Sequence, residues 1–222
     1  MEDMLAGSNV DLADNDGGEW YSAEEQLAQP LLAIYWSLWE CGGGMVADGR
    51  LLDLIRRIYC FGMSLLKLDV RQESTRHRDA VDAITTYLGY GSFKEWDEDR
   101  KIEWLTEELA TKRPLIPADM PMTDEVREVL ETFRVAARLG SASLGAYVIS
   151  MAQKASDVLA VELLQKEARG QVAAETGTRP DASRSLRVVP LFETLDDLDA
   201  AGEELITTPP AALPSSWPRD RR

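Results

Sequence analysis

The sequence predicts an α/β fold that is mainly helical and has about three short strands. Short, nearly continuous apolar runs occur at 64–71, 145–151 and 186–193. Between them lie long stretches with apolar residues every three or four positions, the spacing of amphipathic helices. Strand, helices, strand, helix, strand, helix is the order of parallel strands joined by helical crossovers. Parallel strands are usually covered on both faces, so we expect all three to be buried.

The composition is that of a globular protein with an acidic balance. Of the 222 residues, 45% are hydrophobic and 28% are charged, and the net charge is −15. Such a protein lacks the clustered Lys and Arg of a nucleic-acid surface. No apolar run approaches the ~20 residues of a membrane span, and the acidic N-terminus has no signal-peptide pattern. We therefore predict a cytosolic protein with no nucleic-acid or membrane partner, in which Cys41 and Cys60 are reduced packing residues.

The N-terminal part is predicted to be a disordered acidic leader followed by two helices. Residues 1–21 are rich in Asp, Asn and Gly and show little apolar period. Helical spacing begins after Ser22, the predicted N-cap, and is broken by the three glycines at 42–44. Because these glycines follow a helix and not a strand, we interpret them as a connection and not as a phosphate loop. Asp48 is the predicted N-cap of the second helix, at 49–62.

Four helices are expected after the first strand, at about 76–88, 94–110, 123–139 and 156–169. Thr123 is the predicted N-cap of the third. The small polar residues at 170–185 predict a flexible loop, and Thr194 with Asp197 predicts the start of a last helix at Leu195. Three strands do not complete a barrel of eight or a doubly wound sheet, so the predicted sheet is incomplete.

The first strand carries a polar stripe that indicates a binding site. Lys67, Asp69 and Arg71 alternate with apolar residues and so share one face of a pleated strand. Ligand sites of parallel α/β folds lie at the carboxyl ends of the strands, where Arg71 follows the first strand and Glu193 the third. A guanidinium and a carboxylate at one edge suit a phosphorylated substrate and a divalent metal. A purely structural ion pair between them explains the same spacing and remains open.

His77 is the only histidine of the chain. Any mechanism with a histidine base must use it, but its place one turn into a helix between two arginines favours a surface or capping role. No catalytic triad pattern, phosphate loop or dinucleotide-binding motif is present.

Several stretches resemble the middle of the phosphoenolpyruvate carboxylases. They are LKLDVRQESTRH at 66–77, GSFKEWDEDRKIEWLTEELATKRPL at 91–115, GAYVISMA at 145–152, SDVLAVELLQKE at 156–167 and RVVPLFETLDDL at 187–198. The similarity runs in order from about Ser22 to Ala201. Several long motifs in register are far more specific than one short pattern.

The resemblance implies the fold and chemistry of that family. Its enzymes are parallel β/α barrels with many extra helices, so this chain would be an incomplete barrel portion. They join phosphoenolpyruvate and bicarbonate to give oxaloacetate and phosphate with Mg²⁺ or Mn²⁺, a carbon-fixing reaction that feeds the tricarboxylic acid cycle. Family likeness assigns Arg71 as the catalytic residue that binds the phosphoenolpyruvate phosphate, and Glu193 as one of two metal carboxylates. The arginine would neutralise the phosphoryl group as it moves to bicarbonate.

Other motifs of the family are absent from this sequence. These are Thr-Ala-His-Pro-Thr, the Gly-Tyr-Ser-Asp-Ser segment with the second metal carboxylate, and the Gly-Arg-Gly-Gly loop. We interpret residues 22–201 as a partial barrel domain with an incomplete active site, and 202–222 as a disordered Pro-rich tail. The leading hypothesis is a central fragment, from a truncated gene product, that is inactive alone.

The alternative is a non-catalytic interaction protein that docks on full-length subunits. An incomplete barrel exposes sheet edges and apolar surface, which a homo-oligomer or a full-length subunit would cover. An unrelated phosphate-sugar barrel enzyme would need most of the missing strands, so it ranks below both.

Overall fold

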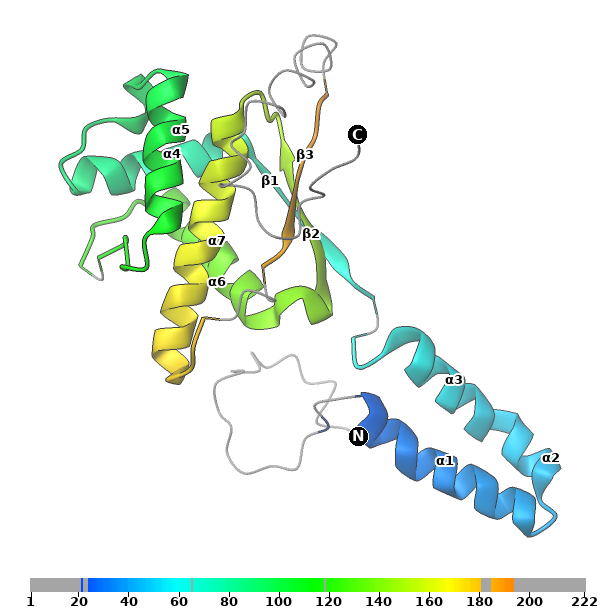
Figure 1. Cartoon of the computed structure of the whole chain (residues 1–222). Helices are drawn as coiled ribbons and strands as arrows, with labels where there is room; N and C mark the ends of the chain where they lie inside the picture. Colours follow the sequence, from blue (N-terminus) through cyan, green and yellow to red (C-terminus); the bar gives the residue numbers. More distant parts are fainter. Residues whose placement is uncertain (1–20, 22–23, 65, 118, 181–184, 194–222) are drawn as a thin grey trace. The chain divides into compact units, whose positions relative to one another are not determined.

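A computed structural model of the chain describes residues 21, 24–64, 66–117, 119–180 and 185–193 (Figure 1). The chain divides into two compact units, Met1–Lys67 and Leu68–Arg222. The predicted leader apart from Tyr21, the predicted helix from Leu195 and the predicted tail lie outside the described residues.

The first unit is a helical hairpin. Its elements are α1 (Glu24–Glu40), α2 (Gly44–Val46), the π-helical turn η1 (Ala47–Leu51) and α3 (Leu52–Phe61). The glycine connection between the two helices is confirmed, and Gly42 has a φ of 79°, in the region that favours glycine. Asp48 is not the predicted N-cap of α3. It lies inside η1, where its Oδ1 accepts a hydrogen bond from the Tyr35 hydroxyl at 2.8 Å.

Cys41 and Cys60 are free but exposed, so the prediction that they pack inside is wrong. The buried stripe of α3 consists of Ile55 and Ile58. Cys60 follows Ile58 by two positions, which turns its side chain to the opposite side of an α-helix. Cys41 lies in the turn after α1, where its side chain is exposed.

The second unit contains one parallel sheet, with the strand order β1-β2-β3. Its elements are β1 (Leu68–Glu73), α4 (Ser74–Tyr87), the 3₁₀ turn η2 (Phe93–Glu95), α5 (Glu98–Ala110), α6 (Asp124–Ser143), β2 (Leu144–Ser150), α7 (Ala155–Thr176) and β3 (Arg187–Pro190). The three predicted strands, their parallel order and the four helices are confirmed, but β1 begins four residues later than predicted and continues past Arg71 to Glu73. The Thr123 N-cap is also confirmed, because its hydroxyl accepts a hydrogen bond from Val126 N. The sheet is open, as expected of part of an α/β barrel.

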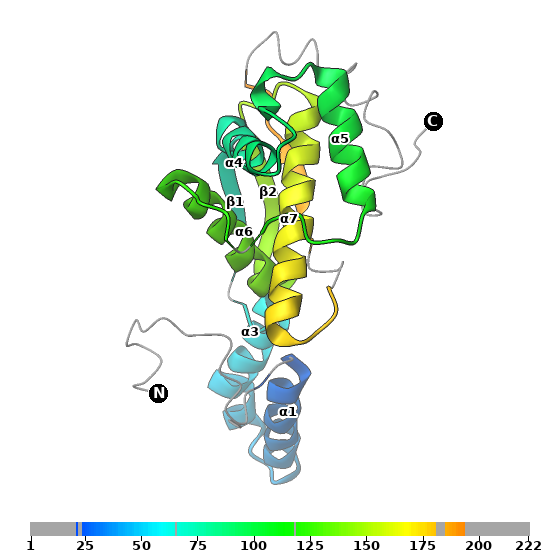
Figure 2. The ribbon, with the colours of Figure 1, turned by 90° about the vertical axis from the view of Figure 1, so that its left-hand side faces the viewer.

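The helices of the second unit lie on one face of the sheet (Figures 1 and 2). Tyr147, Ile149 and Val188 point to that face and are buried, whereas Leu68 at the outer edge of β1 is 63% exposed. The prediction that all strands are buried on both faces is therefore wrong for β1 and β3. These two strands are the edges of the sheet, and within the described residues of this unit no helix covers its other face (Figure 1).

The helix α7 lies between the sheet and α5 (Figure 2), and it is longer than predicted. It continues to Thr176 and ends at Gly177, whose φ of 64° is typical of a helix C-cap. The prediction of a loop over 170–185 is thus wrong for its first seven residues. Val172 and Ala173 are buried, and this packing stabilises a segment whose small polar residues suggested a loop. No helix in the described part of the chain has the length and apolar content needed to cross a bilayer.

Candidate functional site at the carboxyl edge of the sheet

Asp69 fills a break in the hydrogen-bond ladder between β1 and β2. The register of the two strands shifts between Leu68 and Val70, and the Asp69 Oδ1 accepts a hydrogen bond from Ala146 N at 2.7 Å. A side chain at Gly145 would collide with this carboxylate. Asp69 is therefore a structural member of the polar stripe, and its contact lies at the register shift, whereas Arg71 pairs regularly with Val148 two residues before the end of β1.

The structure brings the two predicted site residues together. Arg71 Nη2 donates a hydrogen bond to Glu193 Oε1 at 2.9 Å, and the two side chains are 59% and 33% exposed. The chain after β3 stays beside β2, because Leu191 N donates to Ile149 O at 2.8 Å. This contact is also what a purely structural ion pair between Arg71 and Glu193 would show. An exposed pair contributes only about 0–1 kcal/mol to stability, so it leaves the arginine accessible to a ligand at little cost.

The end of β2 also contacts Glu193. Met151 N lies 3.4 Å from Glu193 Oε2 and donates a long hydrogen bond to it. The Met151 carbonyl accepts a hydrogen bond from the buried Ser74 hydroxyl at 2.7 Å. Residues from all three strand ends therefore meet at this edge. Sequence reasoning did not single out Ser74, although its place immediately after a strand, at the start of a helix, is a typical site for a hydroxyl that bonds the backbone.

His77 lies in the core and not on the surface, so the predicted surface or capping role is wrong. It is fully buried, and its Nε2 is 3.0 Å from the Tyr147 hydroxyl. That hydroxyl donates to Gln72 Oε1 at 2.8 Å. Burial, together with the positive charges of Arg76 and Arg78, lowers the pKa of His77 to about 3. The ring is neutral at ordinary pH, and its contacts are those of a packed structural residue.

Glu193 is the residue that the sequence analysis predicts as a ligand of a divalent cation. Glu193 is a hard oxygen donor of the kind that Mg²⁺ and Mn²⁺ prefer, and it is partly exposed. Among the described residues, no group of three or more His, Cys, Asp or Glu side chains comes together. Glu193 fits as one ligand of a hard cation, and the remaining ligands would be water, substrate or residues from outside this group.

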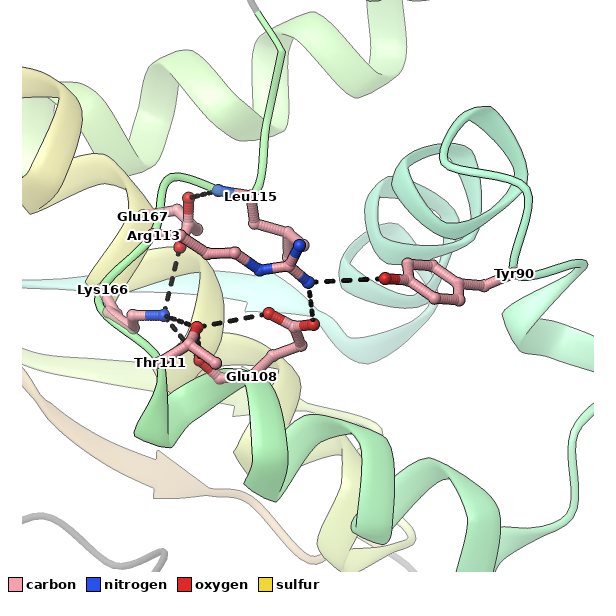
Figure 3. Close-up of polar contacts among 7 residues, drawn as sticks. All are labelled: Tyr90, Glu108, Thr111, Arg113, Leu115, Lys166 and Glu167. Atoms are coloured by element: carbon pink, nitrogen blue, oxygen red, sulfur yellow. Dashed lines mark hydrogen bonds and ion pairs between the residues drawn. The ribbon is translucent and has the colours of Figure 1, made fainter.

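A second polar cluster lies at the end of α5 (Figure 3). The nearly buried Glu108 carboxylate accepts hydrogen bonds from Arg113 Nη2 at 2.7 Å and from the Thr111 hydroxyl at 3.3 Å. Arg113 Nη2 also donates to the Tyr90 hydroxyl at 3.4 Å. Lys166 Nζ donates to Glu108 O at 2.6 Å. The charged groups are thus paired within the chain.

The same cluster attaches the loop after α5 to α7. The buried Glu167 carboxylate accepts a hydrogen bond from Leu115 N at 2.7 Å and lies 3.4 Å from Lys166 Nζ (Figure 3). Because its members bond to one another and to the backbone, we interpret this cluster as structural. The exposed edge at Arg71 and Glu193 is the better candidate site.

Comparison with protein families identifies the group to which this chain is related. The family model described as phosphoenolpyruvate carboxylase matches residues 3–209. The chain belongs to the phosphoenolpyruvate carboxylase family. The match includes all the helices and strands found in the described residues of both units.

Individual phosphoenolpyruvate carboxylases are similar over most of this chain. It is 63% identical over 236 residues to phosphoenolpyruvate carboxylase 2 of Chlamydomonas reinhardtii, covering 99% of this chain and 19% of that protein. It is 60% identical to phosphoenolpyruvate carboxylase 4 of Arabidopsis thaliana, covering 83% and 18%. It is 52% identical to the C4 phosphoenolpyruvate carboxylase of Flaveria trinervia, covering 82% and 18%. The chain therefore spans about a fifth of the length of the curated relatives it matches.

Proposed function

We propose that this chain carries part of the active site of a phosphoenolpyruvate carboxylase, the enzyme that joins phosphoenolpyruvate and bicarbonate to give oxaloacetate and phosphate. The observation that carries the proposal is the meeting of Arg71 and Glu193 at the carboxyl edge of the parallel sheet. Family membership supports it. A barrel completed by further strands would place both residues at its catalytic rim.

Arg71 is the proposed phosphate-binding residue. Its guanidinium is more than half exposed and holds Glu193 through Nη2. A planar guanidinium can turn to bind a phosphate through two parallel hydrogen bonds. It would then neutralise the phosphoryl oxygens of phosphoenolpyruvate as the group moves to bicarbonate.

Glu193 is the proposed metal-binding carboxylate, for Mg²⁺ or Mn²⁺. A divalent cation bound there supplies positive charge next to the oxygens that become negative in the reaction. In the structure Glu193 Oε1 accepts from Arg71 and Oε2 accepts from Met151 N. If Arg71 turns to bind phosphate, it releases Glu193 Oε1 for the cation. The ion pair would then be replaced by two contacts, one from Arg71 to phosphate and one from Glu193 to the metal.

Phosphate binding by Arg71 is tested with inorganic phosphate and phosphoenolpyruvate in calorimetric titrations of the full chain. Arg71→Gln is expected to weaken binding at least tenfold, because a charge-assisted bidentate contact is lost. Arg127→Gln is the matched control, because Arg127 has a similarly exposed side chain paired with Asp124 on α6. Equal binding by the two variants would show that Arg71 does not bind the phosphate.

We expect no turnover by this chain alone, because its sequence lacks the second metal carboxylate and the histidine motif of the family. The test is a coupled assay for oxaloacetate with the purified chain, phosphoenolpyruvate, bicarbonate and Mg²⁺. Metal-dependent oxaloacetate formation that Arg71→Gln abolishes would contradict the expectation of inactivity and support the site.

The second candidate function is that of an interaction protein that docks on full-length subunits. Both β1 and β3 are edges of an open sheet, and Leu68 is exposed at one of them. Unpaired strand edges bind further strands. Co-purification with a full-length phosphoenolpyruvate carboxylase that Arg71→Gln does not change would favour this function. A homo-oligomer formed by the chain without a full-length subunit would favour self-association.

We also propose a cytosolic location. Cys41 and Cys60, the only cysteines of the chain, are free and exposed. A reducing compartment keeps exposed thiols in that state. Fractionation of cells that express the tagged chain tests this location, and recovery with organelles would contradict it.

A further inference from the structure

The three strand ends of the sheet are connected through the backbone of Met151. Its carbonyl accepts from the Ser74 hydroxyl at 2.7 Å, and its N–H donates to Glu193 Oε2 at 3.4 Å. Ser74 follows β1, Met151 follows β2, and Glu193 comes after β3. The bond to Glu193 is longer than the usual 2.9–3.0 Å of an N–H···O bond. A small displacement of Met151 would therefore break it.

Met151 has a backbone conformation that needs support. Its φ is 54°, and it is the one described residue other than glycine with a positive φ. The left-handed region is unfavourable for a residue with a Cβ. The Met151 side chain is 41% exposed, so it is not anchored by full burial. The Ser74 hydroxyl is fully buried and provides the contact that fixes its carbonyl.

Ser74 is in turn contacted by Arg78, which pairs with the buried Asp157 carboxylate and is itself one third exposed. Arg78 Nη2 donates to Ser74 Oγ at 3.1 Å, and Arg78 Nε lies 3.4 Å from Asp157 Oδ1. The other carboxylate oxygen of Asp157 accepts from Gln153 N at 3.0 Å and Lys154 N at 3.2 Å. The loop between β2 and α7 is therefore held at Met151 by Ser74 and at Gln153 and Lys154 by Asp157.

We propose that Ser74 is a positioning residue for Glu193, acting through Met151, with Arg78 and Asp157 as its support. The hydroxyl keeps Met151 in its left-handed conformation, which aims the Met151 N–H at Glu193 and holds the carboxylate toward Arg71. This inference rests on the proposed function in so far as Glu193 binds a divalent cation. The contacts themselves can be tested without metal.

The first test uses NMR without metal on the whole 222-residue chain. It compares the wild type with Ser74→Ala, Ser74→Thr and Thr132→Ala. Thr132 is the matched control, because its hydroxyl donates to a backbone carbonyl, Glu128 O, at 2.8 Å on an exposed part of α6. Loss of one supporting hydrogen bond should speed hydrogen exchange of the Met151 amide about fivefold to tenfold in Ser74→Ala. The carboxyl ¹³C resonance of Glu193 should move in the same variant. Ser74→Thr should restore both, and Thr132→Ala should change neither.

The second test measures Mn²⁺ affinity by electron paramagnetic resonance. Ser74→Ala should weaken Mn²⁺ binding about fivefold, with Ser74→Thr close to the wild type. Absence of Mn²⁺ broadening at Glu193 in the wild type would refute the proposed metal role, and the metal-free readouts would then decide the positioning role. Unchanged Met151 exchange and an unmoved Glu193 resonance in Ser74→Ala would overturn the inference. If Ser74→Ala does not fold, Arg78→Gln replaces it, with a change of about twofold expected in the same direction.

Discussion

Asp69 and Arg71 lie two residues apart on one face of β1 and have different roles. Asp69 replaces a missing backbone partner of Ala146, whereas the Arg71 side chain contacts Glu193, which follows β3. The alternation in the sequence places both residues on the same face of the strand. It does not distinguish their roles. Which of the two is available to a ligand depends on what the neighbouring strand presents.

Gly145 is the residue on which the Asp69 contact depends. A Cβ at this position would meet the Asp69 carboxylate and the Leu68 carbonyl, so Gly145→Ala should lower the free energy of unfolding by about 2 kcal/mol. Gly170→Ala on α7 is the control, because a Cβ there has no atom within 4 Å. It should raise stability by about 0.5–1 kcal/mol. Urea unfolding measures both, and equal effects of the two substitutions would rule out the proposed contact.

Two buried titratable residues should give opposite pH dependences of stability. Burial and the charges of Arg76 and Arg78 lower the pKa of His77 to about 3. As the pH falls below about 6.5, His77 is therefore protonated in the unfolded chain but stays neutral in the folded chain. Burial raises the pKa of Glu162 to about 7, against the effect of Arg169, so the folded chain takes up a proton first between pH 7 and 4.5. From pH 7 to 5, His77 should reduce the free energy of unfolding by about 2 kcal/mol and Glu162 should increase it by a similar amount.

The two contributions can be separated by substitution. Glu162→Gln should lose about 2 kcal/mol more stability than the wild type between pH 7 and 5, and His77→Gln should gain about as much over the same change. Denaturant unfolding at the two pH values measures these differences. Parallel pH dependences of the wild type and both variants would show that neither group has the shifted pKa.

At the scale of an element, α7 shows how packing extends a helix. Residues 170–176 have the composition of a loop, yet Val172 and Ala173 are buried and Glu175 pairs with Arg138 of α6 at 3.1 Å. Burial of these apolar side chains therefore stabilises the last two turns of α7. Weak local helix preference is commonly overridden in this way.

Val172 tests the extension of α7. Val172→Ala should lower the free energy of unfolding by about 1–2 kcal/mol, because buried methyl groups are removed from a packed site. Ala174→Ser, at an exposed position two residues later, should stay within about 0.5 kcal/mol of the wild type. If the segment were a solvated loop, the two substitutions would have equally small effects in thermal or urea unfolding.

At the scale of the whole chain, the second unit is a sheet with one face covered and two open edges. The family match covers this unit together with the helical hairpin, and the relatives are about five times as long as the chain. An open edge with an exposed apolar residue such as Leu68 favours pairing with another strand.

Self-association through β1 is therefore expected. The chain should form oligomers at concentrations of tens of micromolar, and Leu68→Lys should shift sedimentation toward the monomer by placing a charge on the edge. Val135→Lys is the control, because Val135 is an exposed apolar residue on α6 (51%) away from the strand edge. A similar shift in both variants would indicate nonspecific hydrophobic association instead.

The sequence alone determined the three parallel strands, the Thr123 cap, and the two residues that meet at the sheet edge. These follow from local periodicity, from turn and cap chemistry, and from the rule that parallel strands end at one edge. Quoted motifs also identified the family, which the comparisons confirm.

Only the tertiary structure decided what lies against each residue. It showed that His77 is buried beside Tyr147, that Asp69 bonds the neighbouring strand, that α7 reaches Thr176, and that the edges of the sheet are exposed. All four depend on contacts between residues far apart in the chain, which a local pattern does not encode. The same holds for Ser74 and Met151, 77 positions apart, whose contact connects β1 to the carboxylate proposed to bind metal.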